Sequence, residues 1–151
     1  ARQRVFWLKQ VIENQDGYRF FYRSNGARID REQDLQLLYA LTWFATESDV
    51  NREVNNGRGP VDFKVSRGSR DKSLVEFKLA KNTQLEKNLE KQLAIYEAAN
   101  NTKKSLTVIL FLSEDELLRV ESILRRLKLT DDEDIILIDA RNDNKPSGSK
   151  A

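Results

Sequence analysis

A run of seven residues, 106–112, contains a single polar side chain, that of Thr107. Such an almost wholly apolar run is typical of a central β-strand covered on both faces, because a strand with an exposed face alternates polar and apolar residues. Residues 135–138, Ile-Ile-Leu-Ile, predict a second buried strand of this kind. Strands covered on both faces need helices on either side of the sheet, so the chain is constrained to an α/β fold.

Periodicity and turn residues predict the other elements. Residues 61–65 and 74–79 alternate polar and apolar side chains, as strands with one buried face do. Asp30 and Ser113 each stand three residues before a Gln or Glu, which is the capping-box pattern of a helix start. In chain order we expect a short helix, a turn at Asp16–Gly17, a short strand at 18–22, a helix after Asp30, strands at 49–54 and 61–65, a polar turn at 66–72, a strand at 74–79, a helix at 83–99, a strand at 106–112, a helix to about 127, a strand at 135–138 and an irregular tail from 141.

The order of these elements indicates a mixed central β-sheet flanked by helices. A length of 151 residues fits one domain, which buries enough surface for a core without disulfides or metals. No stretch approaches the roughly 20 apolar residues of a membrane span. Because methionine is absent, we expect a domain of a longer protein, and the absence of cysteine fits the cytoplasm.

The lack of histidine and cysteine restricts the chemistry of the chain. It excludes Ser-His-Asp and Cys-His catalysis and zinc sites built on Cys and His. A bound metal would need oxygen ligands, which favours Mg²⁺, Mn²⁺ or Ca²⁺. The 26 basic and 24 acidic residues leave a net charge of +2, too small for a protein that coats DNA regardless of sequence.

Two carboxylates and a lysine are predicted to share one face of the hairpin formed by 61–65 and 74–79. Glu76 and Lys78 share a face because alternate residues of a strand point the same way. When the apolar rows of both strands coincide, Asp62 lies on that face too, and a slip of one residue would bury the charges. Neighbouring carboxylates repel each other, and a bound divalent cation relieves that repulsion.

The helix at 83–99 carries a glutamine on its apolar stripe. Leu85, Leu89, Gln92 and Tyr96 fall at positions i, i+4, i+7 and i+11. A buried amide without a partner costs about 1–3 kcal/mol, so Gln92 needs a polar neighbour. Such local inconsistencies tend to mark functional sites.

Together these residues resemble the PD-(D/E)xK nucleases, the restriction-endonuclease-like superfamily. The matching motifs are Gly59-Pro60-Val61-Asp62, Glu76-Phe77-Lys78 and Gln92-x-x-x-Tyr96. The last of these is similar to the Q-x-x-x-Y motif of the RecB-like branch. An acidic residue on the helix that precedes these motifs is also typical of the superfamily, and Glu32 fits.

The resemblance covers residues 30–112 and implies an α-β-β-β-α-β core. Residues 1–29 would then be an extension, and 113–140 an added helix and strand. The stretch 51–62 and the tail 139–151 also resemble a bacterial family of such domains, carried at the end of longer proteins, to which we attach no activity.

The resemblance implies a magnesium-dependent phosphodiester hydrolase. Asp62, Glu76 and the backbone carbonyl of Phe77 would hold one Mg²⁺ or Mn²⁺ ion. Glu32 would complete the ligands or hold a second ion or a water molecule. Lys78 would orient the attacking water and stabilise the transition state.

Three further residues have roles that stay open. Gln92 would bond the attacking water or a phosphate oxygen. Tyr96 would position the scissile strand or support the catalytic lysine. Glu53, on the strand before the glycine-rich loop, is the alternative to the helix carboxylate.

Basic residues concentrate within about twenty residues of the Asp62 motif. A charge run is usually a solvated face, but beside a metal site it suits phosphate contacts. We expect contacts with the nucleic-acid backbone, DNA being favoured over RNA, from Arg58, Lys64, Arg67, Arg70 and Lys72.

The expected function is therefore a DNA nuclease of weak sequence specificity, targeted by other domains of a longer protein or by formation of a homodimer. Two alternatives stay open: an inactive nucleic-acid-binding or docking domain with the same fold, and a dimeric, structure-selective resolvase. At residue level, Glu76 and Lys78 could be an ordinary exposed strand face, and Gln92 with Tyr96 a polar pair of the core.

Overall fold

The computed structural model describes residues 2–28, 31–41, 49–55, 60–67, 71–98 and 105–145. For part of these ranges it describes the backbone alone. These are residues 41, 49–55, 60–67, 71–74, 96–98 and 105.

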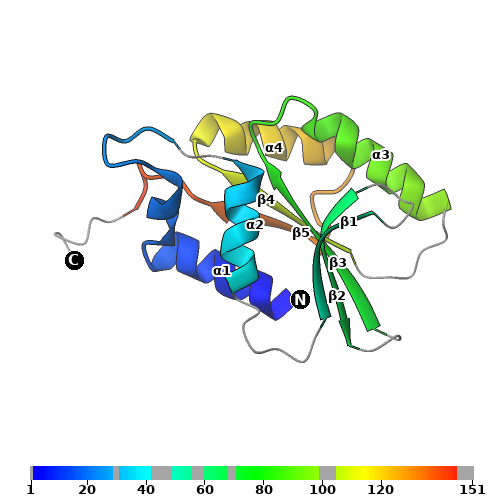
Figure 1. Cartoon of the computed structure of the whole chain (residues 1–151). Coiled ribbons are helices and arrows are strands. Elements are labelled where there is room, and N and C mark those ends of the chain that lie inside the picture. Colours follow the sequence, from blue (N-terminus) through cyan, green and yellow to red (C-terminus); the bar gives the residue numbers. More distant parts are fainter. Residues whose placement is uncertain are drawn as a thin grey trace.

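The described elements form one five-stranded mixed sheet with helices on both faces (Figure 1). The strand order is β1-β2-β3-β4-β5, in which β2 runs antiparallel to β1 and β3, while β3, β4 and β5 are parallel. The elements are α1 (Arg2–Asn14), the 3₁₀ helix η1 (Gly17–Phe21), α2 (Glu32–Leu41), β1 (Asp49–Asn55), β2 (Pro60–Arg67), β3 (Asp71–Leu79), α3 (Leu85–Ala98), β4 (Ser105–Phe111), α4 (Glu114–Arg126) and β5 (Ile135–Asp139).

Strand β4 is covered on both faces, as its apolar run predicts. Val108 and Leu110 belong to the core cluster shared with α1 and α2, whereas Ile109 and Phe111 belong to the cluster shared with α3 and α4. All four side chains are buried. The expectation of a mixed α/β sheet flanked by helices is confirmed. Among the described helices, none combines the length and apolar character that crossing a membrane requires.

The expected short strand at 18–22 is wrong, because this segment forms the 3₁₀ helix η1. Tyr18 and Phe21 are both buried, and a spacing of three residues puts them on one side of a 3₁₀ turn. Asp16 opens the turn with a left-handed φ of 64°. At Gly17 an added Cβ would lie 2.7 Å from the carbonyl oxygen of Val11, so the turn packs against α1 too closely for a side chain.

The hairpin strands are longer than their alternating patterns predict. A polar turn is expected at 66–72, but residues at both its ends continue the ladder, since Ser66 pairs with Lys72 and Arg67 with Asp71. The middle of the expected turn, 68–70, lies outside the described residues. Main-chain hydrogen bonds do not depend on side-chain polarity, so a polar run does not end a ladder where its strands can still pair.

The predictions for the helix cap of α4 and for the segment after β5 agree with the structure. Ser113 caps α4 as expected, with its Oγ accepting a hydrogen bond from the Glu116 amide at 3.1 Å. The described part of the tail, 141–145, is irregular, as expected, and it is anchored to β5, because Lys145 Nζ lies 2.9 Å from the Asp139 carboxylate.

Candidate functional site

The pairing of β2 with β3 brings Asp62 beside Glu76. Phe63 pairs with Val75 in this antiparallel ladder, so the residue before Phe63 and the residue after Val75 come opposite each other. Directly opposed residues occupy the same face of a sheet, with Cα atoms about 4.5–5.5 Å apart. The described pairs end at Phe63 and Val75, and continuing their register by one residue gives the expected arrangement of the backbone. The Asp62 side chain lies outside the described residues.

A third acidic position continues this row on β1. Arg52 pairs with Phe63 and Val54 pairs with Val61, so Glu53 comes opposite Asp62. The backbone thus lines up three acidic residues on neighbouring strands. Only for the one on β3, Glu76, is the side chain described.

The Glu76 side chain is buried, with 3% of its surface exposed. Its Oε2 accepts a hydrogen bond from Gln92 Nε2 and lies 3.9 Å from Lys78 Nζ. Removing a carboxylate from water is expensive unless hydrogen bonds and an opposite charge compensate. The interpretation of Glu76 as part of an ordinary exposed strand face is therefore wrong. Its carboxylate belongs to a buried polar cluster with Gln92 and Lys78.

Helix α3 supplies the amide of that cluster. Leu85 and Leu89 are buried against the sheet, and Gln92 lies one turn further along the same stripe. The predicted need of Gln92 for a polar partner is confirmed, and that partner is Glu76. Tyr96 lies one turn beyond in the same helix, but its side chain is outside the described set.

Strand β4 adds a polar residue that we did not select from the sequence. Thr107 pairs with Glu76 and is 9% exposed. The sequence contained a signal for it, because Thr107 is the single polar residue in the run 106–112.

Glu32 approaches the sheet from the layer of helices that contains α2, on the face opposite to α3. It starts α2, and its Oε1 accepts a hydrogen bond of 3.3 Å from the Leu79 amide, at the carboxyl end of β3. Tyr39, two turns along α2, is fully buried and packs its ring 4.9 Å from that of Phe77. This packing fixes α2 against β3, so the Glu32 carboxylate is held one residue beyond Lys78.

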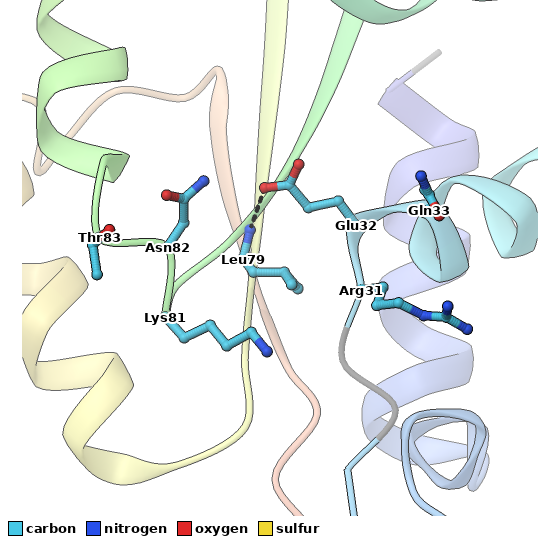
Figure 2. A pocket seen from close by; sticks show the side chains of 7 residues that line it. All are labelled: Arg31, Glu32, Gln33, Leu79, Lys81, Asn82 and Thr83. Carbon is cyan, nitrogen blue, oxygen red and sulfur yellow. Dashed lines mark hydrogen bonds between the residues drawn. The ribbon is translucent and has the colours of Figure 1, made fainter.

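A pocket of about 590 Å³ opens beside Glu32 (Figure 2). One wall is the start of α2 and the other is the segment that joins β3 to α3. Figure 2 shows the Glu32 carboxylate pointing across the pocket toward Leu79 and Asn82. Its lining residues are Arg31, Glu32, Gln33, Leu79, Lys81, Asn82 and Thr83.

The structure separates the basic residues expected to bind nucleic acid. Lys64 lies two residues from Asp62 on β2, and Lys72 lies four residues from Glu76 on β3, so both occupy positions on the face of the acidic row. Arg67 occupies a position on the opposite face. Their side chains lie outside the described set. Arg58 and Arg70 lie entirely outside the described residues.

Among the side chains that the structure describes, no three acidic groups gather as a metal site would require. Glu32 and Glu76 belong to that set, whereas Glu53 and Asp62, the other two acidic candidates, do not. The backbone row is therefore the observation that bears on metal binding.

Residues 1–114 match the family described as "Domain of unknown function (DUF8371)". The chain belongs to the DUF8371 family. No curated protein matches it at a significant level. The DUF8371 segment ends at the start of α4, so it contains every residue of the candidate site, from Glu32 to Tyr96.

Proposed function

We propose that this DUF8371 domain is a metal-dependent nuclease that hydrolyses phosphodiester bonds in DNA. The observation that carries the proposal is the buried Glu76 carboxylate, which holds Gln92 and Lys78 while its backbone lies opposite Asp62. A buried ionised cluster is weak evidence for stability, because desolvation offsets most of its attraction. Such clusters are often arranged for chemistry.

The order of the elements supports the same function. Elements α2, β1, β2, β3, α3 and β4 follow one another as α-β-β-β-α-β, the core that the likeness to PD-(D/E)xK nucleases implies. In this arrangement the two motif strands pair, and the glutamine helix packs beside them. This pairing and the contact between Gln92 and Glu76 support a common site for the three sequence motifs.

The donor set fits a hard divalent cation. The chain offers carboxylates and carbonyls without any imidazole or thiol, which suits Mg²⁺ or Mn²⁺. Glu76 and Asp62 would hold the ion together with the Phe77 carbonyl, and Glu32 or Glu53 would add a carboxylate. A bound ion would supply a lowered pKa of water and neutralisation of charge on the phosphate.

The protein groups then have separable tasks. Lys78, whose side chain is 15% exposed, would place its ammonium against the charge that develops on the scissile phosphate. Gln92 would keep the Glu76 carboxylate in one orientation through its hydrogen bond. Tyr96 would contact the substrate strand from the next turn of α3.

Cleavage of a labelled DNA duplex and a single strand in Mg²⁺ tests the proposal. Lys78→Ala and Glu76→Gln should each slow cleavage by about 10²–10³-fold, the usual cost of losing one group that stabilises the transition state. Lys87→Ala and Glu90→Gln, exposed positions on α3, are the matched controls and should leave the rate unchanged.

The outcomes separate the proposal from its rivals. DNA binding without cleavage in Mg²⁺ or Mn²⁺ would overturn the nuclease and favour the binding domain. Paired cuts confined to branched DNA, made by a protein whose mass in solution is that of a dimer, would favour the resolvase. Equal cleavage by wild type and Lys78→Ala would remove the lysine from the mechanism.

A further inference from the structure

We infer that the pocket between α2 and the segment after β3 binds a backbone phosphate of the DNA strand, next to the phosphate that is cleaved. This inference rests on the proposed nuclease function and extends it, because it gives the strand a path away from Glu76 and Lys78. The two basic residues that line it, Arg31 and Lys81, are not among those that the sequence analysis expected to bind nucleic acid.

Two cationic side chains line the pocket, Arg31 from the start of α2 and Lys81 from the opposite wall. Arg31 is 70% exposed and uses Nε for a long, 3.4 Å ion pair with Asp34. Exposed pairs of this kind contribute little, so the guanidinium can turn to a ligand at small cost. Figure 2 shows the Lys81 side chain extending beneath Leu79 toward the α2 wall.

Neutral donors complete the lining. Asn82 uses its Oδ1 to accept the Gln84 amide at 2.9 Å, which leaves its amide nitrogen facing Glu32 across the pocket (Figure 2). Thr83 adds a hydroxyl on the same wall. A phosphate oxygen accepts hydrogen bonds from all of these groups, as is common for contacts that position a nucleic-acid backbone.

Hydrogen bonds with α4 and β4 hold the backbone of the pocket wall that carries Lys81 and Asn82. Arg119 of α4 donates to the carbonyl oxygens of Ala80 and Asn82, the latter at 2.9 Å, and the Ala80 amide bonds Leu110 O at 2.9 Å. A wall held in this way loses little conformational freedom when a ligand binds, which favours affinity.

The pocket lies directly along β3 from the candidate catalytic groups. Leu79, in the pocket, is three residues beyond Glu76, or about 10 Å along an extended strand. That separation falls between one and two phosphate steps of a DNA strand, so the pocket would take a phosphate near the scissile one. Glu32 is the one acidic group among the described lining residues, beside the two basic residues Arg31 and Lys81.

Equilibrium binding of a fluorescein-labelled 20-base-pair DNA duplex in EDTA, followed by anisotropy over a range of salt concentrations, tests the inference without cleavage. The test protein carries Arg31→Gln and Lys81→Gln. The matched control carries Arg125→Gln and Lys87→Gln, which remove one Arg and one Lys from exposed positions on α4 and α3.

For one lost phosphate contact, the slope of log K against log salt should become shallower by about 0.9. The same relation gives roughly five- to tenfold weaker binding at 0.1 M salt. The control should keep the wild-type slope. If the test protein has the same slope as the control while wild type cleaves DNA, the inference that the pocket binds a phosphate is wrong and the proposed nuclease function still stands. A wild-type protein that neither binds nor cleaves DNA would overturn both.

Discussion

Replacing Glu76 by glutamine should slow cleavage by about 10²–10³-fold with almost no loss of stability. At 3.9 Å and an effective dielectric constant near 20, the attraction between Lys78 and Glu76 is about 4 kcal/mol. The hydrogen bond from Gln92 to the charged carboxylate adds about 1.5–3 kcal/mol. Against these gains, burial of each charged group costs several kcal/mol, so the net contribution of the charge is close to zero.

Glutamine keeps the shape of the glutamate and can turn its carbonyl oxygen to the Gln92 amide. Lys78, which is partly exposed on a flexible stem, can move its ammonium toward water. We therefore expect the free energy of unfolding to change by less than about 1 kcal/mol, equivalent to about 2–4 °C in Tm for a chain of this length.

Urea unfolding followed by far-ultraviolet circular dichroism measures this difference, with Glu90→Gln, an exposed position on α3, as the control. A loss of about 3–5 kcal/mol in Glu76→Gln is the signature of a broken structural ion pair. That result would refute the reasoning, because the cluster would then be explained by stability alone.

Three further predictions concern single contacts of the described chain. Gln92→Ala should destabilise the protein by about 1.5–3 kcal/mol through the buried Glu76 carboxylate, and a double-mutant cycle with Glu76→Leu, which cannot accept the hydrogen bond, should recover most of that as coupling; an additive cycle would contradict the contact. Ser113→Ala should cost about 1 kcal/mol in urea unfolding by removing the α4 cap, whereas no change would show that the cap is dispensable. Burial raises the pKa of Asp139, but hydrogen bonds from the Arg141 amide, Lys145 and Asn144 outweigh it and lower the pKa overall. Asp139→Asn should therefore lower the free energy of unfolding at pH 7, and the difference from wild type should shrink as the pH falls below about 4. A difference in unfolding free energy that does not depend on pH would contradict this.

The sheet could be predicted where side-chain pattern alone decides the structure. The apolar run at 106–112 has no polar face, so β4 had to be covered on both sides, and its neighbours fall into two separate cores. The register of the hairpin agrees with the coincidence of its two apolar rows, but the expectation that this register leaves the charged face open is wrong, because α3 covers that face and Glu76 is buried there.

Where backbone geometry decides, the sequence was less informative. Residues 18–22 are rich in aromatic side chains, which favours a strand, yet Tyr18 and Phe21 reach the core from a 3₁₀ turn that starts at a left-handed Asp16. Likewise, the strands of the hairpin extend past their alternating residues because ladder hydrogen bonds need only the main chain.

The candidate site divides in the same way. The partnership of Gln92 with Glu76 was foreseeable, because a polar group on an apolar stripe must find a partner. The pocket beside Glu32 was not, since it depends on how α2 packs over β3 and on Arg119 of a distant helix holding the Ala80 and Asn82 carbonyls. Contacts between residues nearly forty positions apart leave no local sequence signal.

The central claim is that a divalent cation binds on the face of Asp62 and Glu76. Isothermal titration with Mg²⁺ and Mn²⁺, in the presence of a DNA duplex with uncleavable phosphodiester analogues, tests it by comparing wild type with Asp62→Asn. The account predicts saturable binding to wild type that is lost in the variant. Equal binding to both proteins would place the metal elsewhere, and the absence of binding to wild type with DNA present would contradict a metal-dependent nuclease.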